Sequence, residues 1–434
     1  MKLQIEKAVY GGAGLAHQIE GDNAGRAVFV PFTLPGEIVE ARLLEQKDAF
    51  GEALLIQLLL PSKDRVQPVC VHFGQCGGCH YQHAAYPAQV EMKRAILRET
   101  LERVGLTALP TIQAHIAEPW AYRNRTRLRL EELDTKLKVG YNRRGSNEFL
   151  PIKECPILAP LIWQASEALL HVATEDSAAA RWAKTAAEVE FFTTRDEKKL
   201  HMAVFVRKKH TGFEIFCKRM LELVPELAGA HVLQLATSGP QRQAKTSRQL
   251  ERWGAEGLNY RVAAEEYWVS RGGFFQVNRF LVDELIRIVT EGRQGTIAWD
   301  LYAGVGLFSR VLARAFQQVT AVETAANDLS RSFKGGGKRA VEATTVEFLR
   351  NAVVQRERPD VIVLDPPRAG VGAEVCSLLA RVSAPEIVYV SCDPVTLARD
   401  LKALTGAGYN LVDLHMVDMF PQTFHLETVA VLRR

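Results

Sequence analysis

The sequence predicts an α/β protein of two or three domains that ends in a doubly wound, mainly parallel sheet. Its 434 residues are too many for one compact core, and their composition is that of a globular protein throughout. From residue 296 onward, short apolar strands alternate with helical stretches, which is typical of a parallel sheet with crossover helices. Residues 1–62 instead show apolar runs separated by the turn sequences GGAG and LPGE, which predicts a small closed β-barrel. We therefore expect a barrel over 1–62, a central α+β domain over 63–262 and the parallel-sheet domain over 263–434.

Charge and composition indicate in which compartment the protein works, but they do not identify its binding partner. A net charge of +4 is compatible with nucleic acid but does not require it. The longest apolar stretch, Ala53 to Leu60, is far too short to span a bilayer, and the N-terminus lacks the apolar segment of a signal peptide. Seven cysteines, three of them crowded between residues 70 and 79, suggest metal ligands and a reactive thiol in a reducing compartment. We expect a soluble, cytoplasmic protein without a membrane partner.

One amphipathic helix stands out in the first half of the chain. It is predicted over Pro87–Gly105, with proline early, glycine at its end, and Leu97, Leu101 and Val104 on one stripe. We expect this helix to serve packing and not chemistry.

The predicted strands of the C-terminal domain end at side chains that are able to bind ligands. The strands TIAWDLY, VTAVE, VIVLD and IVYVSC end at Tyr302, Glu323, Asp365 and Cys392. Because ligands of such sheets bind beyond the carboxyl ends of the parallel strands, we expect these four side chains to converge on one site.

A glycine turn follows the first of these strands. In Ala303-Gly304-Val305-Gly306 the glycines let the backbone approach a cofactor, and Glu323 can accept ribose hydroxyls. The turn is shorter than a dinucleotide fingerprint, so it favours a nucleoside cofactor such as S-adenosylmethionine, although a purely structural turn is about equally consistent with it. The later run Gly335-Gly336-Gly337-Lys338 lacks the spacing of a phosphate loop and predicts a flexible turn.

Two further segments place polar groups near the same edge. In Asp365-Pro366-Pro367-Arg368 the prolines hold the chain extended, so Asp365 and Arg368 are presented rigidly at the mouth of the site. In FHLE, before the last strand, Glu427 is a candidate base and His425 a candidate for holding the loop. Taken alone, the proline segment is also consistent with a simple loop breaker, and His425 and Glu427 with exposed or structurally hydrogen-bonded side chains.

Cys392 is a candidate nucleophile because of where it lies. It ends a buried strand, and Asp393 and Pro394 have the pattern of a helix cap followed by a first helical residue. A thiol at a helix start is expected to have a lowered pKa, although the Asp393 carboxylate opposes part of this effect. A lone cysteine at a strand end is more often a small buried hydrophobic residue, which is how we interpret Cys217 and Cys376.

Four cysteines form a candidate metal site. Three lie in CVHFGQCGGC and the fourth in KECPIL: Cys70, Cys76, Cys79 and Cys155. Four thiolates suit either zinc or an iron–sulfur cluster, and spacing alone does not choose between them. A disulfide pair conflicts with the expected compartment, and zinc binding through nearby histidines would leave a cysteine over.

Alternating arginines mark a candidate nucleic-acid surface. They occupy every second position of YRNRTRLRL, so on a strand all share one face: Arg123, Arg125, Arg127 and Arg129. Such a stripe can follow phosphates, and a solvated strand face is the alternative. Further basic clusters at 207–209 and 242–252 favour RNA.

The motifs DPPRAG, VYVSCDPVTLARDL and VDMFPQTFHLE together resemble those of the RNA uracil-C5 methyltransferases, which make 5-methyluridine in ribosomal and transfer RNA. The resemblance covers essentially the whole chain, and the segments GGAGLAH and VFVPFTLPGE are similar to the RNA-binding TRAM barrel of many members. It implies an OB-like TRAM barrel, a central domain with an iron–sulfur cluster, and a Rossmann-like class I methyltransferase domain.

The resemblance also implies a substrate and partners. It points to S-adenosylmethionine as methyl donor and to a monomer acting on a uridine of 23S ribosomal RNA, and not on DNA. A transfer RNA T-loop uridine is the nearest alternative. A cytosine-C5 methyltransferase and a non-catalytic RNA-binding or folding protein on the same scaffold are further alternatives.

Residue roles carry over by motif. The resemblance implies Cys392 as nucleophile, Glu427 as base and Arg368 as an RNA contact. It implies a [4Fe-4S] cluster, more than zinc, on Cys70, Cys76, Cys79 and Cys155. The cofactor and uracil pocket is implied to involve Gln276, Tyr302, Gly304, Gly306, Leu307, Glu323, Thr344 and Asp365. Two of these depart from the family pattern, since Leu307 stands where a polar contact is usual and Thr344 where Asp or Asn is usual. Phe274 and Phe275 are candidates for supporting a flipped uracil.

Overall fold

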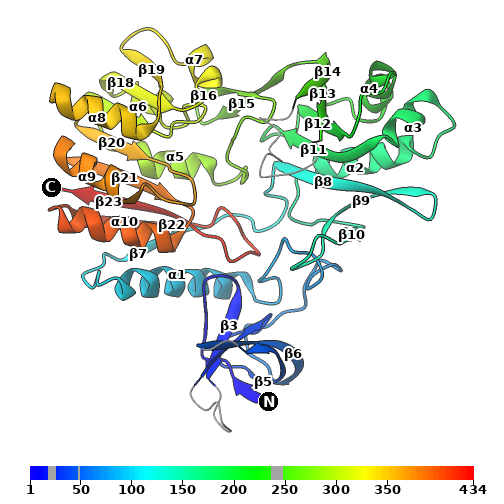
Figure 1. The fold of residues 1–434 in the computed structure, drawn as a ribbon, viewed down its shortest axis with the longest axis horizontal. Coiled ribbons are helices and arrows are strands. Elements are labelled where there is room, and N and C mark those ends of the chain that lie inside the picture. The colour runs from blue at the N-terminus through cyan, green and yellow to red at the C-terminus, as the bar shows by residue number, and fades with distance from the viewer. Residues whose placement is uncertain (18–25, 47–48, 236–247) are drawn as a thin grey trace.

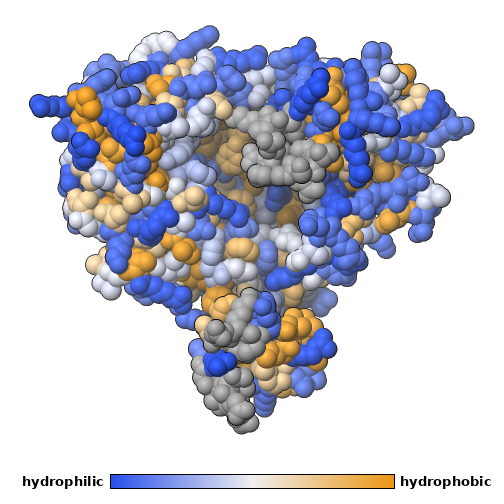
Figure 2. Space-filling model, in the orientation of Figure 1, coloured by the Kyte–Doolittle hydropathy of each residue, from blue (hydrophilic) through white to orange (hydrophobic). Residues whose placement is uncertain are grey.

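The computed structural model describes residues 1–17, 26–46, 49–235 and 248–434 in three structural units (Figure 1). A small N-terminal β unit lies below two larger units, the C-terminal sheet on the left of the view and the central sheet on the right. Figure 2 shows the molecular surface hollowed between these units. Among the described residues, no helix combines the length and apolarity that a membrane span needs.

The N-terminal unit is one strongly curved six-stranded sheet. Its strand order is β1 (Lys2–Gln4), β5 (Ile38–Gln46), β6 (Phe50–Leu60), β4 (Ala27–Pro31), β3 (Ala13–His17), β2 (Lys7–Ala8). The outermost strands of this order, β1 and β2, are separated by only two residues, so the two edges of the sheet meet. Alternation along the strands directs one set of side chains into a small core that includes Val28, Val30 and Val39.

The central unit is a seven-stranded, mainly antiparallel sheet. Its order is β10 (Phe149–Pro151), β9 (Lys136–Asn142), β8 (Arg125–Leu133), β11 (Ala186–Thr193), β12 (Leu200–Val206), β13 (Leu227–Gln234), β14 (Gln249–Gly254), with only β12 and β13 parallel. Three helices pack on it: α2 (Pro160–Val172), α3 (Ala178–Ala183) and α4 (Phe213–Leu223). Leu128 and Leu130 of β8 face this helical layer, so the alternating arginines face the other way.

The C-terminal unit confirms the predicted doubly wound sheet. The eight strands run in the order β19 (Lys338–Glu342), β18 (Phe316–Glu323), β17 (Gly295–Leu301), β20 (Val361–Leu364), β21 (Glu386–Ser391), β23 (Glu427–Arg433), β22 (Asn410–Val417), β7 (Ile112–His115). The first five are parallel, and β23 is antiparallel to both of its neighbours.

Helices cover both faces of this sheet. One face carries α8 (Thr345–Gln355), α9 (Gly372–Val382) and α10 (Pro394–Gly406). The other carries α5 (Val282–Thr290), α6 (Ser309–Leu312) and α7 (Asn327–Ser332). The hairpin of β15 (Gly257–Val262) and β16 (Glu265–Ser270) shares the hydrophobic core of this second face.

Two boundaries differ from the expected division of the chain. The expected boundary at 262 falls in the turn of the β15–β16 hairpin, whose strands belong together because they pair along their whole length. Helix α1 (Tyr86–Arg103) was expected in the central domain, but its apolar side chains lie in the core formed by α8, α9 and α10. Strand β7 follows α1 and pairs in parallel with β22. Residues 86–115 therefore complete the C-terminal unit, although they precede the central one in sequence.

Candidate functional site

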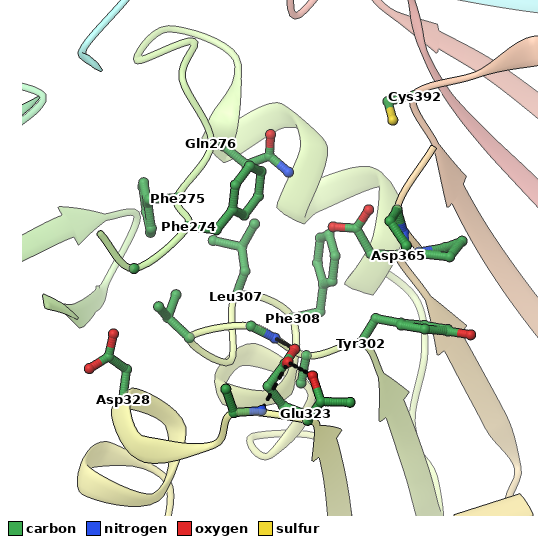
Figure 3. A pocket seen from close by; sticks show the side chains of 18 of the residues that line it. Phe274, Phe275, Gln276, Tyr302, Leu307, Phe308, Glu323, Asp328, Asp365 and Cys392 are labelled. Carbon is green, nitrogen blue, oxygen red and sulfur yellow. Dashed lines mark hydrogen bonds between the residues drawn. The ribbon is translucent and has the colours of Figure 1, made fainter. Parts of the chain in front are cut away.

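A cavity of about 670 Å³ opens at the carboxyl ends of the parallel strands (Figure 3). We call it the strand-end cavity. It brings together nine of the side chains that the sequence predicted: Gln276, Tyr302, Gly304, Leu307, Glu323, Asp365, Arg368, Cys392 and Glu427. Of the residues implied for the cofactor and uracil pocket, two lie outside its lining. Gly306 packs behind the turn, where an added Cβ would approach Leu329 to 2.9 Å, and Thr344 caps α8 in a capping box with Glu347.

The turn after β17 is held in place by Glu323. Tyr302 and Gly304 have φ values of 66° and 56°, so the chain turns sharply as it leaves the strand. The Gly304 N–H donates to Glu323 Oε2 at 3.0 Å, while Glu323 Oε1 accepts from the Thr324 hydroxyl at 2.9 Å. Figure 3 shows these bonds at the base of the cavity. Glu323 Oε1 also accepts from the Ala325 N–H at 3.3 Å. A carboxylate has about four acceptor positions, so about one on Glu323 stays available to a ligand hydroxyl.

A buried carboxyl that the sequence analysis missed supports the same turn. Asp300 in β17 is fully buried and accepts hydrogen bonds from the Ser309 N–H at 2.9 Å and from the Ser309 hydroxyl. Burial raises the pKa of Asp300 to about 7 even though these bonds oppose the shift. The available signal was a carboxylate in the middle of the apolar strand TIAWDLY, which requires a buried partner.

Cys392 lies between the end of β21 and the start of α10. The helix cap predicted for this segment is confirmed, because Asp393 Oδ1 accepts from the N–H groups of Val395 and Thr396 at 3.0 Å each, and Pro394 is the first helical residue. The expected lowering of the thiol pKa is wrong. Burial first, and then the Glu427 and Asp365 carboxyls, raise the pKa of Cys392 to about 12, while Arg368 acts in the opposite direction.

Two carboxyls face this thiol in the cavity. Burial raises the pKa of Asp365 to about 7, with a further contribution from Asp300. Glu427, at the start of β23, is 3% exposed, and burial together with Asp365 raises its pKa well above the ordinary value. The cavity thus holds a thiol and two carboxyls whose pKa values are all raised.

Arg368 and His425 stand at the mouth. Arg368 is exposed, and its guanidinium lies 3.5 Å from His425 Nδ1. Burial first, and then Arg368, lower the pKa of His425 to about 4, so the imidazole is neutral near pH 7. The His425 ring packs on Phe424 with 4.1 Å between centroids, which agrees with a role in holding the loop.

The two phenylalanines of GGFFQ have different environments. Phe275 is 2% exposed and packs on Tyr260 with 4.4 Å between ring centroids, so it belongs to the core. Phe274 is 66% exposed while lining the cavity, which leaves it available to a ligand. Phe308 and Phe420 also line the cavity and were missed by the sequence analysis.

The four predicted metal ligands lie near enough to one another for their charges to interact. Burial raises the pKa of Cys79 and Cys155 to about 12 each, and the thiols of the set raise one another's pKa further. Burial also raises the pKa of Cys70 and Cys76. In the part of the chain that the structure describes, no three His, Cys, Asp or Glu side chains are already close enough to hold a single ion.

The arginine stripe shares one face but makes many internal contacts. Arg125 is half-buried, donates to the Gly273 carbonyl and stacks over Phe192. Arg127 pairs with Glu188 at 2.5 Å. Arg123, Arg127 and Arg129 line a second cavity of about 580 Å³ beside the cysteine segment. Of the additional basic clusters, 207–209 is exposed, whereas residues 242–247 lie outside the described residues.

Comparison with known proteins adds independent findings. Residues 343–434 match the family model described as tRNA (Uracil-5-)-methyltransferase. The chain is 31% identical to the 23S rRNA (uracil(1939)-C(5))-methyltransferase RlmD of Aeromonas hydrophila, over 95% of this chain and 93% of that one. It is 32% identical to the RlmD of Chromohalobacter salexigens over 100% and 89% of the two chains, and 32% identical to an uncharacterized RNA methyltransferase of Aquifex aeolicus over 100% and 98%.

A solved structure has the same fold over the full length. The tRNA (uracil-54, C5)-methyltransferase of Pyrococcus abyssi, in complex with S-adenosyl-L-homocysteine, superposes with a TM-score of 0.76 at 22% identity and covers 99% of both chains.

Proposed function

The chain belongs to the family of RNA uracil-C5 methyltransferases, and on that premise we propose that it methylates carbon 5 of a uridine in 23S ribosomal RNA. The observation that carries the proposal is the strand-end cavity, which brings together a thiol, the buried Glu427 carboxyl and the half-buried Asp365 carboxyl in a space of about 670 Å³. The two RlmD relatives, which align over nearly the whole chain, favour ribosomal RNA. We further propose that the protein acts as a cytoplasmic monomer.

The cavity suits S-adenosylmethionine as the methyl donor. Leu307 and Phe308 offer an apolar wall to an adenine ring, and Glu323 offers a carboxylate to ribose hydroxyls. When bound, this cofactor supplies an electrophilic methyl group on a positively charged sulfur. A positive charge held in this cavity would lower the raised pKa values of Asp365, Cys392 and Glu427, and would thereby favour the Cys392 thiolate.

The proposed chemistry uses two side chains of the cavity in turn. Cys392 thiolate adds to carbon 6 of the uracil, and the electron pair of the 5,6 double bond makes carbon 5 an enolate carbon. Carbon 5 then takes the methyl group, and the bond that joined this group to the sulfur of the donor breaks, with its electron pair remaining on the sulfur. Glu427 removes the remaining proton from carbon 5, the double bond re-forms, and the bond between Cys392 and carbon 6 breaks.

RNA recognition is proposed to use all three units. The target base must leave its stack to reach the cavity, so an unpaired loop is favoured, and the exposed Phe274 ring is placed to stack on the flipped base. Arg368 at the mouth and the arginine stripe are proposed phosphate contacts. The curved N-terminal sheet supports a TRAM-type RNA-binding module.

We also propose that the four neighbouring thiols hold a [4Fe-4S] cluster, with zinc as the less favoured occupant. Cys70, Cys76 and Cys79 come from one segment and Cys155 from another, so the cluster would tie the two segments together. Iron, sulfide and zinc analysis of anaerobically purified protein tests this proposal. Loss of iron and sulfide in Cys155→Ser supports it, and zinc in place of iron contradicts it.

The function is tested with labelled cofactor and total RNA from a strain that lacks the gene. Label that maps to a uridine of 23S RNA supports the proposal, whereas label only in transfer RNA favours the T-loop alternative, to which the matched family model points. Transfer to cytidine-only RNA would indicate a cytosine enzyme. Cys392→Ala should abolish transfer while RNA binding survives, and methylation by this variant would contradict the proposed nucleophile.

A further inference from the structure

Helix α1 contacts the loop that carries the proposed base through two buried polar side chains. Gln89 is 1% exposed and Lys93 is fully buried. They lie four residues apart, so they share one face of the helix. The loop they meet spans residues 418–426, between β22 and β23, and leads directly into Glu427.

The amide of Gln89 is fixed by three hydrogen bonds. Its Oε1 accepts from the Gln422 N–H at 3.0 Å. Its Nε2 donates to Gln422 Oε1 at 2.9 Å and to the Ala84 carbonyl at 2.9 Å. Because donor and acceptor both have partners inside the protein, only one amide orientation satisfies the site.

Gln422 needs this support because of its backbone conformation. It has a φ of 69°, in the left-handed region that side chains other than glycine rarely occupy, and it is 2% exposed. Its carbonyl accepts from the N–H groups of His80 at 2.8 Å and Tyr81 at 3.0 Å. Lys93 Nζ donates to the Phe420 carbonyl at 2.9 Å on the same stretch. The loop is therefore held on both its backbone and its side chains.

We propose that Gln89 is a positioning residue for proton removal from carbon 5. By holding Gln422 in its left-handed conformation, Gln89 fixes the loop that places Phe420 and Glu427 in the strand-end cavity. Gln89 does not line the cavity and touches no reacting atom. This inference rests on the proposed function, because it assigns the loop to the step in which Glu427 acts.

Gln89→Leu tests the inference, since leucine keeps the apolar bulk but removes the amide. With uridine RNA we expect turnover to fall by about 10²-fold, the order of magnitude for a group displaced by about 1 Å. Cys392 can still add and methyl transfer can still occur, so a denaturation-resistant protein–RNA adduct should accumulate. With 5-fluorouridine RNA the adduct should form as fast as in the wild type, because carbon 5 then carries no proton to remove.

Controls separate a positioning role from general destabilisation. Leu101→Val perturbs a fully buried side chain of the same helix three turns away, and it should change neither adduct level nor turnover. Glu427→Gln should reproduce the accumulation. Wild-type turnover in Gln89→Leu, or adduct formation reduced equally on both RNAs, would overturn the positioning role. Failure of the proposed function is seen separately, as the absence of uridine methylation by the wild type.

Discussion

The buried ion pair between Lys93 and Asp418 allows a test of how α1 is coupled to the C-terminal loop. Both side chains are fully buried, and Lys93 Nζ lies 2.6 Å from Asp418 Oδ1. Lys93→Met removes the cation and leaves a carboxylate in a dry environment. Removing one partner of such a pair costs about 3–5 kcal/mol of unfolding free energy, because the remaining charge has lost its compensation.

The double variant Lys93→Met/Asp418→Leu removes both charges and should recover most of that loss. Leucine has the branching of aspartate, and methionine is one atom shorter than lysine, so the pair fits the same space. Urea unfolding of the wild type, both single variants and the double variant gives the coupling free energy of the pair. The exposed pair of Lys218 with Glu214 provides a control, since Lys218→Met should leave the unfolding midpoint unchanged. The reasoning fails if Lys93→Met lowers the unfolding free energy by less than about 1 kcal/mol, or if the double variant is no more stable than Lys93→Met alone.

Three further predictions concern the cavity. Without cofactor, the rate of Cys392 alkylation, followed by mass spectrometry, should still rise with pH beyond pH 10, because the pKa of the thiol is raised to about 12. Glu427→Gln should shift this pH profile to lower pH, because it removes a carboxyl that raises the thiol pKa, and a plateau below pH 9 in the wild type would contradict this. Calorimetry of Glu323→Ala should show affinity for S-adenosylhomocysteine reduced by about tenfold or more, as expected for lost hydrogen bonds to a charged group, and unchanged affinity would exclude a ribose contact. Asp400 accepts a hydrogen bond from the Val371 N–H at 2.8 Å and so holds the loop that follows Arg368. Asp400→Asn should therefore raise the KM for RNA more than the KM for the cofactor, and the reverse order would show that the loop serves the cofactor.

The sequence predicted the parts of the site that depend on local pattern. Each parallel strand is a short apolar run, so its end could be located, and the carboxyl edge of a parallel sheet is where such ends meet. For this reason Glu323, Asp365 and Cys392 were placed correctly at one cavity. Asp393 and Pro394 were recognised because a helix start has a local signature.

Long-range contacts and the burial of individual side chains could not be predicted from local sequence pattern. The pairing of β7 with β22 joins segments about 300 residues apart, and no periodicity in either strand indicates its partner. The thiol pKa of Cys392 was predicted in the wrong direction because the helix start was visible in the sequence, while burial and the Glu427 carboxyl were not. Gln89 and Lys93 were assigned to a packing helix, because buried polar side chains on an apolar stripe have no sequence signal that names their partners.

These long-range contacts explain why the proposed activity requires more than the segment that matches the family model. Residues 343–434 contain Cys392 and Glu427, which are the proposed reacting groups, and Asp365, which lines the same cavity. They do not contain Glu323, which lines the cavity and is the proposed ribose contact, or Gln89, which holds the loop before the proposed base. In the isolated segment Gln422 would lose its reciprocal bonds with Gln89, and the strained loop would have no partner to keep it left-handed. The proposed reacting groups therefore lie in the C-terminal residues, but the loop before Glu427 is held by Gln89, which precedes Gln422 by 333 residues.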